Sequence, residues 1–396
     1  MSADRAYFDW NASAPLRPEA RDAVAAAMDM TGNPSSVHAE GRRARDLVEA
    51  AREQVAALVG AQPAEIVFTS GATEANAWAL AGWETIFLSG IEHDSVLTPA
   101  KTSGARLIDI PTGPDGQARI GVIARQIPER DALGCALVTL QMANNETGVL
   151  QPVADAVSFA REHGLSVHTD ATQAAGRVPI DFAGLGVDLL SLSSHKLGGP
   201  KGTGALVVRD GVTIAPLIAG GGQERRRRAG TENVAAIAGF GAAASAAVRD
   251  LERINDLAAR RDAIERALID LAPECSIIGQ SSPRLANTVC IAWPGKSAET
   301  LVIKLDLAGV AVSAGSACSS GKVGSSHVLE AMGLAVNVAK SAIRVSLGLT
   351  TSDRDIQRLL TAWLAMRGPR SVDADGGNSR RPDTVRPRFE RIPEGV

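Results

Sequence analysis

Lys196 stands where the sequence can place a reactive amine. It follows the apolar run 188–193 and precedes a glycine-rich turn, so we expect a strand end to hold its side chain. Asp170 closes another apolar run, 165–169, and Gln173 follows one helical turn later. A carboxylate there can pair with a protonated ring nitrogen, while an amide can hydrogen-bond a neighbouring ring oxygen. Taken alone, Lys196 also suits a solvated turn, and Asp170 also suits a helix N-cap.

A phosphate-binding turn is predicted at residues 70–76, SGATEAN. The segment joins an expected strand to an expected helix, and its glycine and the small Ala72 let backbone amides approach an anion. Thr73 adds a hydroxyl at the positive end of the helix. The same residues also fit an ordinary capping box of Thr73 with Asn76. The sequence has no GxGxxG after the first strand and no GxxxxGKS/T, so dinucleotide and nucleoside-triphosphate sites are not indicated.

Histidines near strand ends allow a different interpretation. His93 in EHDSVL and Asn145 in NNETG both follow strand-like segments. A metal-dependent hydrolase is therefore the competing hypothesis, although it leaves Lys196 and the 70–76 turn without a role. The side chains that would together hold the metal are His93, His168, Asp170 and His195.

Cys318 differs from the other three cysteines in its surroundings. It lies in the glycine- and serine-rich segment 313–326, which has nothing to anchor a core, so we expect an accessible thiol on a segment able to move. Such a thiol suits a nucleophile that must reach a site and then leave it. Cys135, Cys275 and Cys290 lie in or beside apolar runs and are expected to be inert core or near-core thiols.

Strand and helix patterns must position these residues, and the two alternate through the first two thirds of the chain. Helical spacing is clear over 38–59 and 152–164. The apolar runs of strand length are 65–70, 85–89, 105–110, 136–140, 165–169, 188–193 and 204–208. Continuous apolar strands alternating with helices predict an α/β protein with a mostly parallel sheet covered on both faces. Ligands of such sheets collect at the carboxyl ends of the strands.

The pattern changes near residue 249. One long charged helix is expected over 249–272, followed by strands near 287–292 and 310–313, which together predict a second, smaller α+β domain. The last residues, 368–396, are rich in proline, glycine and arginine and are expected to form a flexible tail.

Composition and charge exclude several classes of protein. The chain has 396 residues, 45% of them apolar and 21% charged, which excludes a wholly disordered or collagen-like chain. A net charge of −3 and an aromatic content of 3% argue against nucleic-acid binding. The longest apolar stretch, 234–248, is shorter than the ~20 residues that a bilayer demands. We expect a cytoplasmic protein, because no signal peptide and no CxxC or disulfide framework are visible.

Taken together, these segments resemble the fold-type I pyridoxal-phosphate enzymes of aminotransferase class V, and more narrowly the cysteine desulfurases of the NifS/IscS-like branch. The resemblance runs in order along nearly the whole chain. It rests on the motifs FDWNASAPLRPEA, GNPSSVH, FTSGATEAN, EHDSVL, NNETGVLQP, HTDATQAAGRVPID, SSHKLGGPKGTGAL, GGGQERRRRAGTENV, GSACSSG and AIRVSLG. It implies a large cofactor-binding domain over 13–248 and a small domain of 1–12 plus 249–367 that carries the cysteine loop, 313–327.

The resemblance implies that pyridoxal 5'-phosphate is the cofactor, and it implies a role for each matching residue. Lys196 would bind the cofactor covalently and later move the Cα proton, Asp170 would pair with the ring nitrogen, and Gln173 would hydrogen-bond the phenolic oxygen. His93 would stack on the ring and assist proton transfers. The phosphate would be bound by Ala72, Thr73, Ser193, His195 and, from a neighbouring subunit, Thr231. The substrate would be met by Asn11, Asn145 and Arg344, the last of which would clamp its carboxylate.

The activity implied is conversion of L-cysteine to L-alanine, with the sulfur passing to Cys318 as a persulfide and then to an acceptor protein. The acceptor could be an iron–sulfur scaffold, a tRNA-thiolation protein or a nitrogenase-assembly factor, and Cys318 could ligate a transferred iron–sulfur cluster. A homodimer with shared active sites is expected. A selenocysteine lyase or related β-lyase is the nearest alternative. A non-enzymatic sulfur-carrier scaffold is another, but it would not need Lys196, Asp170 and the phosphate turn together.

Overall fold

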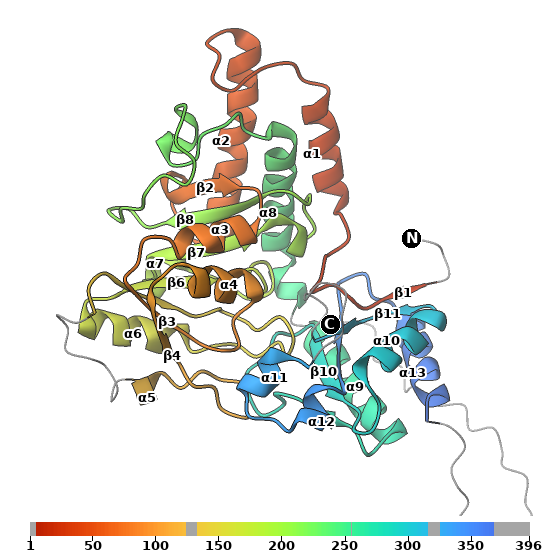
Figure 1. Cartoon of the computed structure of the whole chain (residues 1–396). Helices are drawn as coiled ribbons and strands as arrows, with labels where there is room; N and C mark the ends of the chain where they lie inside the picture. Colours follow the sequence, from red (N-terminus) through yellow and green to blue (C-terminus); the bar gives the residue numbers. More distant parts are fainter. Residues whose placement is uncertain (1–4, 124–132, 255, 316–324, 368–396) are drawn as a thin grey trace, which may run out of the picture.

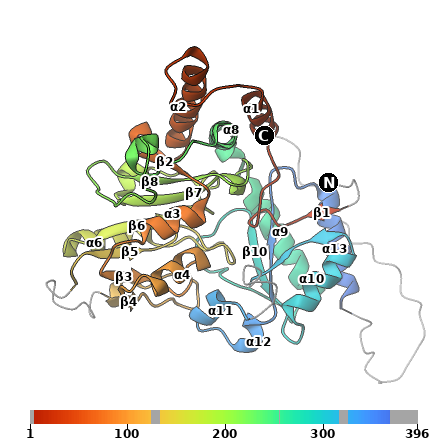
Figure 2. The same cartoon turned by 45° about the horizontal axis from the view of Figure 1, so that its top comes forward.

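Two main β-sheets, a separate two-stranded pair and the surrounding helices form the part of the chain that the structure, a computed structural model, describes. That part comprises residues 5–123, 133–254, 256–315 and 325–367. The larger sheet lies among the helices of the first half of the chain, and the smaller sheet lies beside it with the helices of the second half (Figures 1 and 2).

The larger sheet has seven strands and is mostly parallel. Its strands, in spatial order, are β2 (Ile66–Thr69), β8 (Gly204–Val208), β7 (Leu189–Ser193), β6 (Ser166–Asp170), β5 (Ala136–Thr139), β3 (Thr85–Leu88) and β4 (Arg106–Asp109). Neighbouring strands from β7 to β4 are parallel, while β8 is antiparallel to both β2 and β7. Each strand coincides with one of the apolar runs in the sequence, and the predicted α/β class is confirmed.

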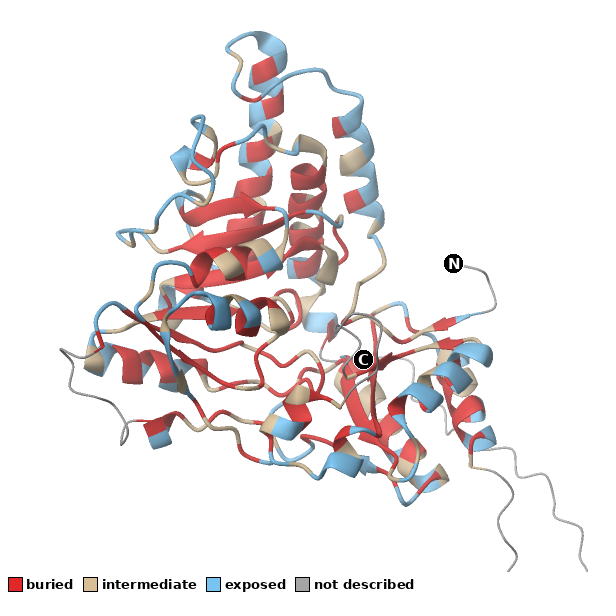
Figure 3. Cartoon of the chain, viewed as in Figure 1, coloured by how far each residue is buried: buried red, intermediate tan, exposed pale blue. Residues whose placement is uncertain are grey.

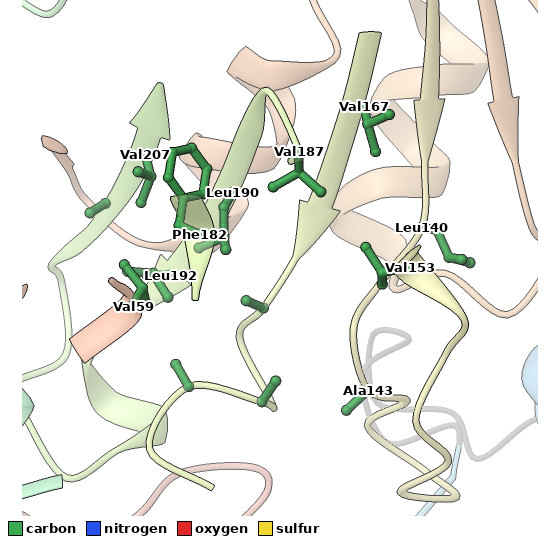
Figure 4. Close-up of a cluster of buried hydrophobic side chains, with 14 of the residues drawn as sticks. Val59, Leu140, Ala143, Val153, Val167, Phe182, Val187, Leu190, Leu192 and Val207 are labelled. Carbon is green, nitrogen blue, oxygen red and sulfur yellow. The ribbon is translucent and has the colours of Figure 1, made fainter. Parts of the chain in front are cut away.

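Helices bury both faces of this sheet, which is why its strands are apolar at successive positions. Phe68 and Val207 belong to the main core, with side chains of α2 and α8, whereas Val67 and Leu206 pack with residues of α3 on the opposite face. Figure 4 shows part of the main core, and Figure 3 shows that the inner strands are buried while the outer helices expose one side. The edge strand β4 is the exception, with three of its four residues exposed. The helices of this half are α1 (Pro18–Met28), α2 (Ala39–Val59), α3 (Ala72–Ala79), α4 (Asp94–Thr102), α5 (Ile120–Ile123), α6 (Val153–His163), α7 (Phe182–Leu185) and α8 (Val234–Ile254).

The smaller sheet is antiparallel and has its own core. Its strand order is β12 (Ser313–Ala314), β13 (Ala342–Ser346), β10 (Thr288–Ala292) and β9 (Ser276–Ile277), and a separate parallel pair joins β1 (Ala6–Tyr7) to β11 (Val310–Ala311). Within this core, the rings of Trp293 and Trp363 lie 4.6 Å apart between centroids. The accompanying helices are α9 (Asp256–Leu271), α10 (Ala298–Leu307), α11 (His327–Ala331), α12 (Val336–Ala339) and α13 (Asp353–Ala365).

The helical pattern expected over 249–272 is found on both sides of residue 255, which lies outside the described residues. Residues 249–254 end α8, and α9 covers 256–271. The two helices serve different cores: Phe240 of α8 packs in the main core, whereas Ile264 of α9 packs in the core of the smaller sheet. A charged surface pattern runs through both helices, so the sequence alone conceals the change of partner.

Helix α8 is longer than the apolar stretch suggested. Its 21 residues make it long and apolar enough to cross a membrane by length and composition, the one such helix in the described part of the chain. Half of that apolar segment is buried inside the protein, and α8 packs along both α1 and α2. These contacts are those of a core helix.

Candidate active site

A cavity of about 360 Å³ opens at the carboxyl ends of the parallel strands. The turns that follow β2, β3, β5, β6 and β7 all contribute to its lining, as expected for a sheet of this kind. The residues singled out in the sequence that line it are Ala72, Thr73, His93, Asn145, Asp170, Gln173, Ser193, His195 and Lys196. Lys201, the other lysine of the same turn, lines it as well.

The start of α3 forms one end of the cavity. The first amides of a helix have no partner within the helix, so those of Ala72 and Thr73 are available to an anion. Gly204 lies so near that a Cβ there would come within 2.7 Å of the Gly71 Cα atom. Glu74 sits in the same turn, and Arg228 donates to its carboxylate at 3.0 Å. Burial opposes ionisation, but the hydrogen bonds from Arg228 and Ser70 prevail and lower the pKa of Glu74.

Asp170 is held at the end of β6 by two donors. The Asn76 side-chain nitrogen donates to Oδ2 at 2.8 Å, and the Thr172 amide donates to Oδ1 at 2.9 Å. Asn76 also donates to Ser95 at 2.9 Å. From the sequence, Asn76 was expected only as a capping residue. Its position in SGATEAN, one turn into the helix, was the feature that could have indicated its contact with Asp170. Both carboxylate oxygens of Asp170 therefore point in fixed directions, and the residue remains part of the cavity lining.

His93 caps the start of α4 and faces the same cavity. Its Nδ1 accepts a hydrogen bond from the Ser95 amide at 3.1 Å. An amide can only donate, so a neutral His93 carries its proton on Nε2. Burial lowers the pKa of His93, and the charge of Lys196 adds to this while that of Asp170 opposes it. The ring is therefore neutral at pH 7, and its Nε2–H can act as a donor.

Lys196 lies in the turn Ser194–Lys196 directly after β7. Its Nζ donates to the main-chain oxygen of Asn11 at 2.6 Å, and the Gln173 amide nitrogen donates to the same oxygen at 3.0 Å. His195 points to the Ser13 hydroxyl at 3.3 Å, and burial together with the charge of Lys196 lowers the pKa of His195 to about 4. The segment around Asn11 thus reaches Lys196 through its backbone.

The Asn11 side chain is fully buried, and its polar atoms already hydrogen-bond to other residues. Its nitrogen donates to Thr288 at 2.9 Å, and its oxygen accepts from Asn287 at 3.0 Å.

Arg344 on β13 lies just behind the cavity lining, where it donates to the Asn145 carbonyl at 3.0 Å and to Asp9 at 2.7 Å. Its Nε atom is buried and has no partner among the described residues.

A buried carboxylate that the sequence analysis missed follows Asn145. Glu146 is 1% exposed and accepts a hydrogen bond from Ser326 at 2.5 Å. Burial raises the pKa of Glu146 to about 7, against the lowering effects of Ser326, His327 and Arg344. Only the NNETG motif pointed to it, and a carboxylate in such a turn is usually solvent-exposed.

The metal hypothesis finds no support in the described residues, which contain no group of three His, Cys, Asp or Glu side chains able to hold a metal. His168 does not reach the cavity. Its two ring nitrogens are hydrogen-bonded inside the sheet, to Thr139 at 2.8 Å and to Ser191 at 2.9 Å. Burial lowers the pKa of His168 to about 4.

The burial of the described cysteines differs from the expectation at one position. Cys275 and Cys290 are buried, and burial raises the pKa of both thiols, that of Cys275 to about 12. The expectation of a core thiol at Cys135 is wrong: this residue is exposed, because it precedes β5 in a turn and only the following strand is covered. Cys318 lies outside the described residues.

The two chain segments that flank residues 316–324 contact residues next to the cavity lining. Ser313 on β12 is paired with Arg344 on β13. On the other flank, His327 Nε2 donates to the carbonyl oxygen of Glu92, one residue before His93, at 2.9 Å. Thr231 is exposed and is not part of the cavity lining of its own chain.

Comparison with known proteins agrees with this geometry. The aminotransferase class-V family description matches residues 6–359. The chain is 38% identical to the cysteine desulfurase IscS of Dictyoglomus turgidum over 370 residues, covering 89% of this chain and 92% of that one. It is 41% identical over 371 residues to a cysteine desulfurase of Cereibacter sphaeroides, covering 90% and 94%.

Solved structures give the same result. A NifS-like protein from Rickettsia africae superposes with a TM-score of 0.84 at 33% identity, covering 92% of this chain and 99% of that chain. The family match over residues 6–359 includes both sheets and every segment that lines the cavity. The chain belongs to the aminotransferase class-V family and, within it, to the cysteine desulfurases of the NifS/IscS type.

Proposed function

We propose that this protein is a pyridoxal-phosphate-dependent cysteine desulfurase that converts L-cysteine to L-alanine and passes the sulfur to Cys318. The observation that carries the proposal is the cavity at the carboxyl edge of the larger sheet. It brings together an amine, a carboxylate, an amide, a histidine and a helix N-terminus, which come from the chain at or after the ends of β2, β3, β6 and β7. The similarity to cysteine desulfurases over about nine tenths of the chain supports the same activity.

The donors and acceptors of the cavity fit pyridoxal phosphate. The start of α3 offers free amides at Ala72 and Thr73 for the phosphate, and Asp170 offers a fixed carboxylate for a ring nitrogen. The Thr172 hydroxyl in the lining is buried and has no partner among the described residues, so a ligand would satisfy it. Ser193 and His195 would complete the phosphate site. When bound, the cofactor supplies an electron sink that weakens the bonds at the substrate Cα atom.

The side chains of the protein would then have distinct tasks. The Lys196 amine would hold the cofactor, exchange with the amine of the substrate, and move the Cα proton. His93, neutral at pH 7, would stack on the ring and assist proton transfers. Gln173 would donate its amide to the phenolic oxygen, and Asn145 would lie beside the ring and substrate.

Substrate binding would centre on Arg344. Its buried Nε atom lacks a partner among the described residues, and a carboxylate could satisfy it together with the neighbouring NH2 atom. Asn11 would contribute through its backbone oxygen, which already meets Lys196. The described residues on either side of 316–324 contact Arg344 on one flank and Glu92, next to His93, on the other, which supports a role for Cys318 at this site.

The sulfur step assigned to Cys318 is a nucleophilic one. Its thiolate would attack the substrate sulfur, so that the Cβ–S bond breaks and an S–S bond forms, leaving a persulfide on Cys318 and a carbon skeleton that takes up a proton as alanine. The persulfide would then pass to an acceptor protein such as an iron–sulfur scaffold. The three described cysteines are free, which suits the reducing cytoplasm.

A homodimer with shared active sites is part of the proposal. Thr231 is exposed and away from the cavity of its own chain, so a partner subunit would use it at the phosphate. Large apolar side chains near α1, including Met28 and Val37, are 73% and 84% exposed, which supports a subunit contact there. A fully active monomer in sedimentation experiments would contradict this arrangement.

We also propose that the chain divides into a large domain, 13–248, and a small domain of 1–12 plus 249–367. Two separate hydrophobic cores support the division. The side chains of Ala6 and Phe8 belong to the same core as those of α9 and α13. Limited proteolysis that releases a stable fragment ending near residue 248 would agree with it.

The direct test is product formation from L-cysteine in the presence of dithiothreitol and added pyridoxal phosphate. Wild type should release alanine and sulfide, and Cys318→Ala should lose sulfide release. Cys135→Ala, which removes an exposed cysteine, is the matched control and should behave as wild type. A Cys318→Ala protein that still splits L-selenocysteine at the wild-type rate would indicate a selenocysteine lyase instead. No alanine from wild type would refute the proposal.

A further inference from the structure

Arg177 is a buried arginine that contacts three segments of the site. It is 8% exposed, and its NH1 atom donates to both the main-chain and the side-chain oxygens of Gln173. Its NH2 atom donates to the main-chain oxygens of Trp10 at 3.4 Å and of Lys196 at 3.2 Å. Every one of these acceptors belongs to, or lies next to, a residue already placed at the active site.

No carboxylate balances this charge within the described residues, where Arg177 forms no ion pair with Asp or Glu. The other buried arginines differ: Arg52 pairs with Glu224, Arg284 pairs with Glu265, and Arg344 pairs with Asp9. Burial and the nearby charge of Arg344 lower the pKa of Arg177 to about 9, so it is still charged at pH 7. Burying an unpaired cation is costly, so its retention calls for a task.

The chemistry of the guanidinium fixes the orientation of Gln173. A guanidinium has only donors, so the Gln173 atom that faces Arg177 must be the oxygen. The Gln173 nitrogen is thereby turned the other way, where it donates to the Asn11 oxygen beside the Lys196 amine. A charged donor on the amide oxygen also polarises the amide and strengthens donation by its nitrogen.

We propose that Arg177 is a positioning residue that acts through Gln173. It holds the Gln173 side-chain nitrogen toward Lys196, so that a ligand bound there is favoured when the oxygen that faces this nitrogen is negatively charged. This inference rests on the proposed function, in which the oxygen is the phenolic oxygen of pyridoxal phosphate. A polarised amide aimed at that oxygen stabilises its anionic form, and the positive charge disfavours a proton on the lysine nitrogen next to it.

The test uses the pH dependence of the absorption of the cofactor-loaded protein. Its midpoint reports protonation of the Lys196 side-chain nitrogen that would link the protein to the cofactor. Arg177→Met should move this midpoint to higher pH by about one unit and weaken cofactor binding about tenfold. Arg177→Lys, which keeps the charge, should restore part of both. Arg284→Met removes a buried arginine that does not line the cavity and should leave the midpoint unchanged.

A double-mutant cycle separates positioning from a general effect of charge or folding. In a Gln173→Ala background, Arg177→Met should shift the midpoint by less than half as much as in wild type. Equal shifts in both backgrounds, or no shift in the single variant, would overturn the proposal.

A second readout needs no cofactor. In wild type labelled with ¹⁵N-glutamine, the Gln173 side-chain amide should give one pair of protected resonances, because its nitrogen is bonded to Asn11. Arg177→Met should broaden or lose that pair, and Arg177→Lys should keep it. An unchanged pair in Arg177→Met would overturn the proposal, whereas failure of wild type to bind pyridoxal phosphate would refute the proposed cofactor only.

Discussion

The two sides of the cavity are built in different ways. On the parallel-sheet side, Asp170 ends strand β6, and Gln173 and Lys196 sit in the turns that directly follow β6 and β7. On the antiparallel-sheet side, just behind the cavity lining, Asp9, Glu146 and Arg344 are held by side-chain contacts between distant segments. The Arg344–Asp9 contact joins positions 335 residues apart.

This difference separates two tasks. Main-chain geometry fixes the parallel-sheet side, and its strands are buried on both faces, so its residues are rigid before any ligand arrives. The antiparallel-sheet side is fixed by charges that an incoming carboxylate can compete for, as Asp9 does on Arg344. We therefore expect the first side to govern cofactor binding and the second to govern the substrate and the sulfur step.

The largest expected effect lies on the parallel-sheet side. Lys196→Ala removes the amine that would hold the cofactor and move the Cα proton, so the rate of alanine formation should fall by about 10⁴-fold or more. Lys201→Ala, in the same turn and the same cavity lining, is the matched control and should reduce that rate by less than tenfold. Similar losses of rate in the two variants would contradict the assignment of Lys196 as the lysine that holds the cofactor and moves the Cα proton.

Glu146→Gln tests the antiparallel-sheet side through stability. Burial raises the pKa of Glu146 from 4.5 to about 7, so between these values the folded protein keeps a proton that the unfolded chain has lost. The free energy of unfolding should therefore decrease as the pH rises from about 4.5 to 7, by up to about 3 kcal/mol. A glutamine mimics the protonated side chain and can still accept from Ser326.

The measurement for this variant is urea unfolding at pH 5 and pH 8. Glu146→Gln should be more stable than wild type at pH 8 and much closer to it at pH 5. An equal difference at the two pH values would show that Glu146 does not titrate in this range.

Arg344→Lys should distinguish the two sides more finely. The lysine keeps the charge and loses the planar fork, so KM for L-cysteine should rise by about 30-fold while the absorption of bound cofactor stays unchanged. Steady-state kinetics and a cofactor titration on the same sample decide the point. A variant that loses its cofactor instead would place Arg344 in cofactor binding and break the division between the sides.

The smallest effect is expected from the exposed ion pair of Arg5 and Asp306, which lies outside the cavity lining. Asp306→Ala should change the free energy of unfolding by about 0.5 kcal/mol or less, because exposed pairs are weak. Its kcat and KM should equal those of wild type. A larger loss would mean that contacts among distant segments near the smaller sheet are stronger than their exposure suggests.

The sequence predicted the parallel-sheet side well because its information is local. A strand pattern followed at once by Asp170 or Lys196 places that residue at the carboxyl edge without any knowledge of distant contacts. Thr73 and His93 were found in the same way, each in a turn after a strand.

What the sequence could not show depends on pairs of distant residues. The hold of Asn76 on Asp170 spans 94 positions, and the contact of Glu146 with Ser326 spans 180. No periodic pattern records such pairs. Cys135 was misjudged because an apolar run does not reveal where the strand begins.

The central claim is that Lys196 holds the cofactor covalently at the edge of the larger sheet. The most direct measurement is borohydride reduction of the protein loaded with pyridoxal phosphate, followed by digestion and mass spectrometry of the peptides. The account predicts one modified lysine, Lys196, and no modification in Lys196→Ala. Modification of Lys201 alone, or unselective labelling of surface lysines, would contradict it.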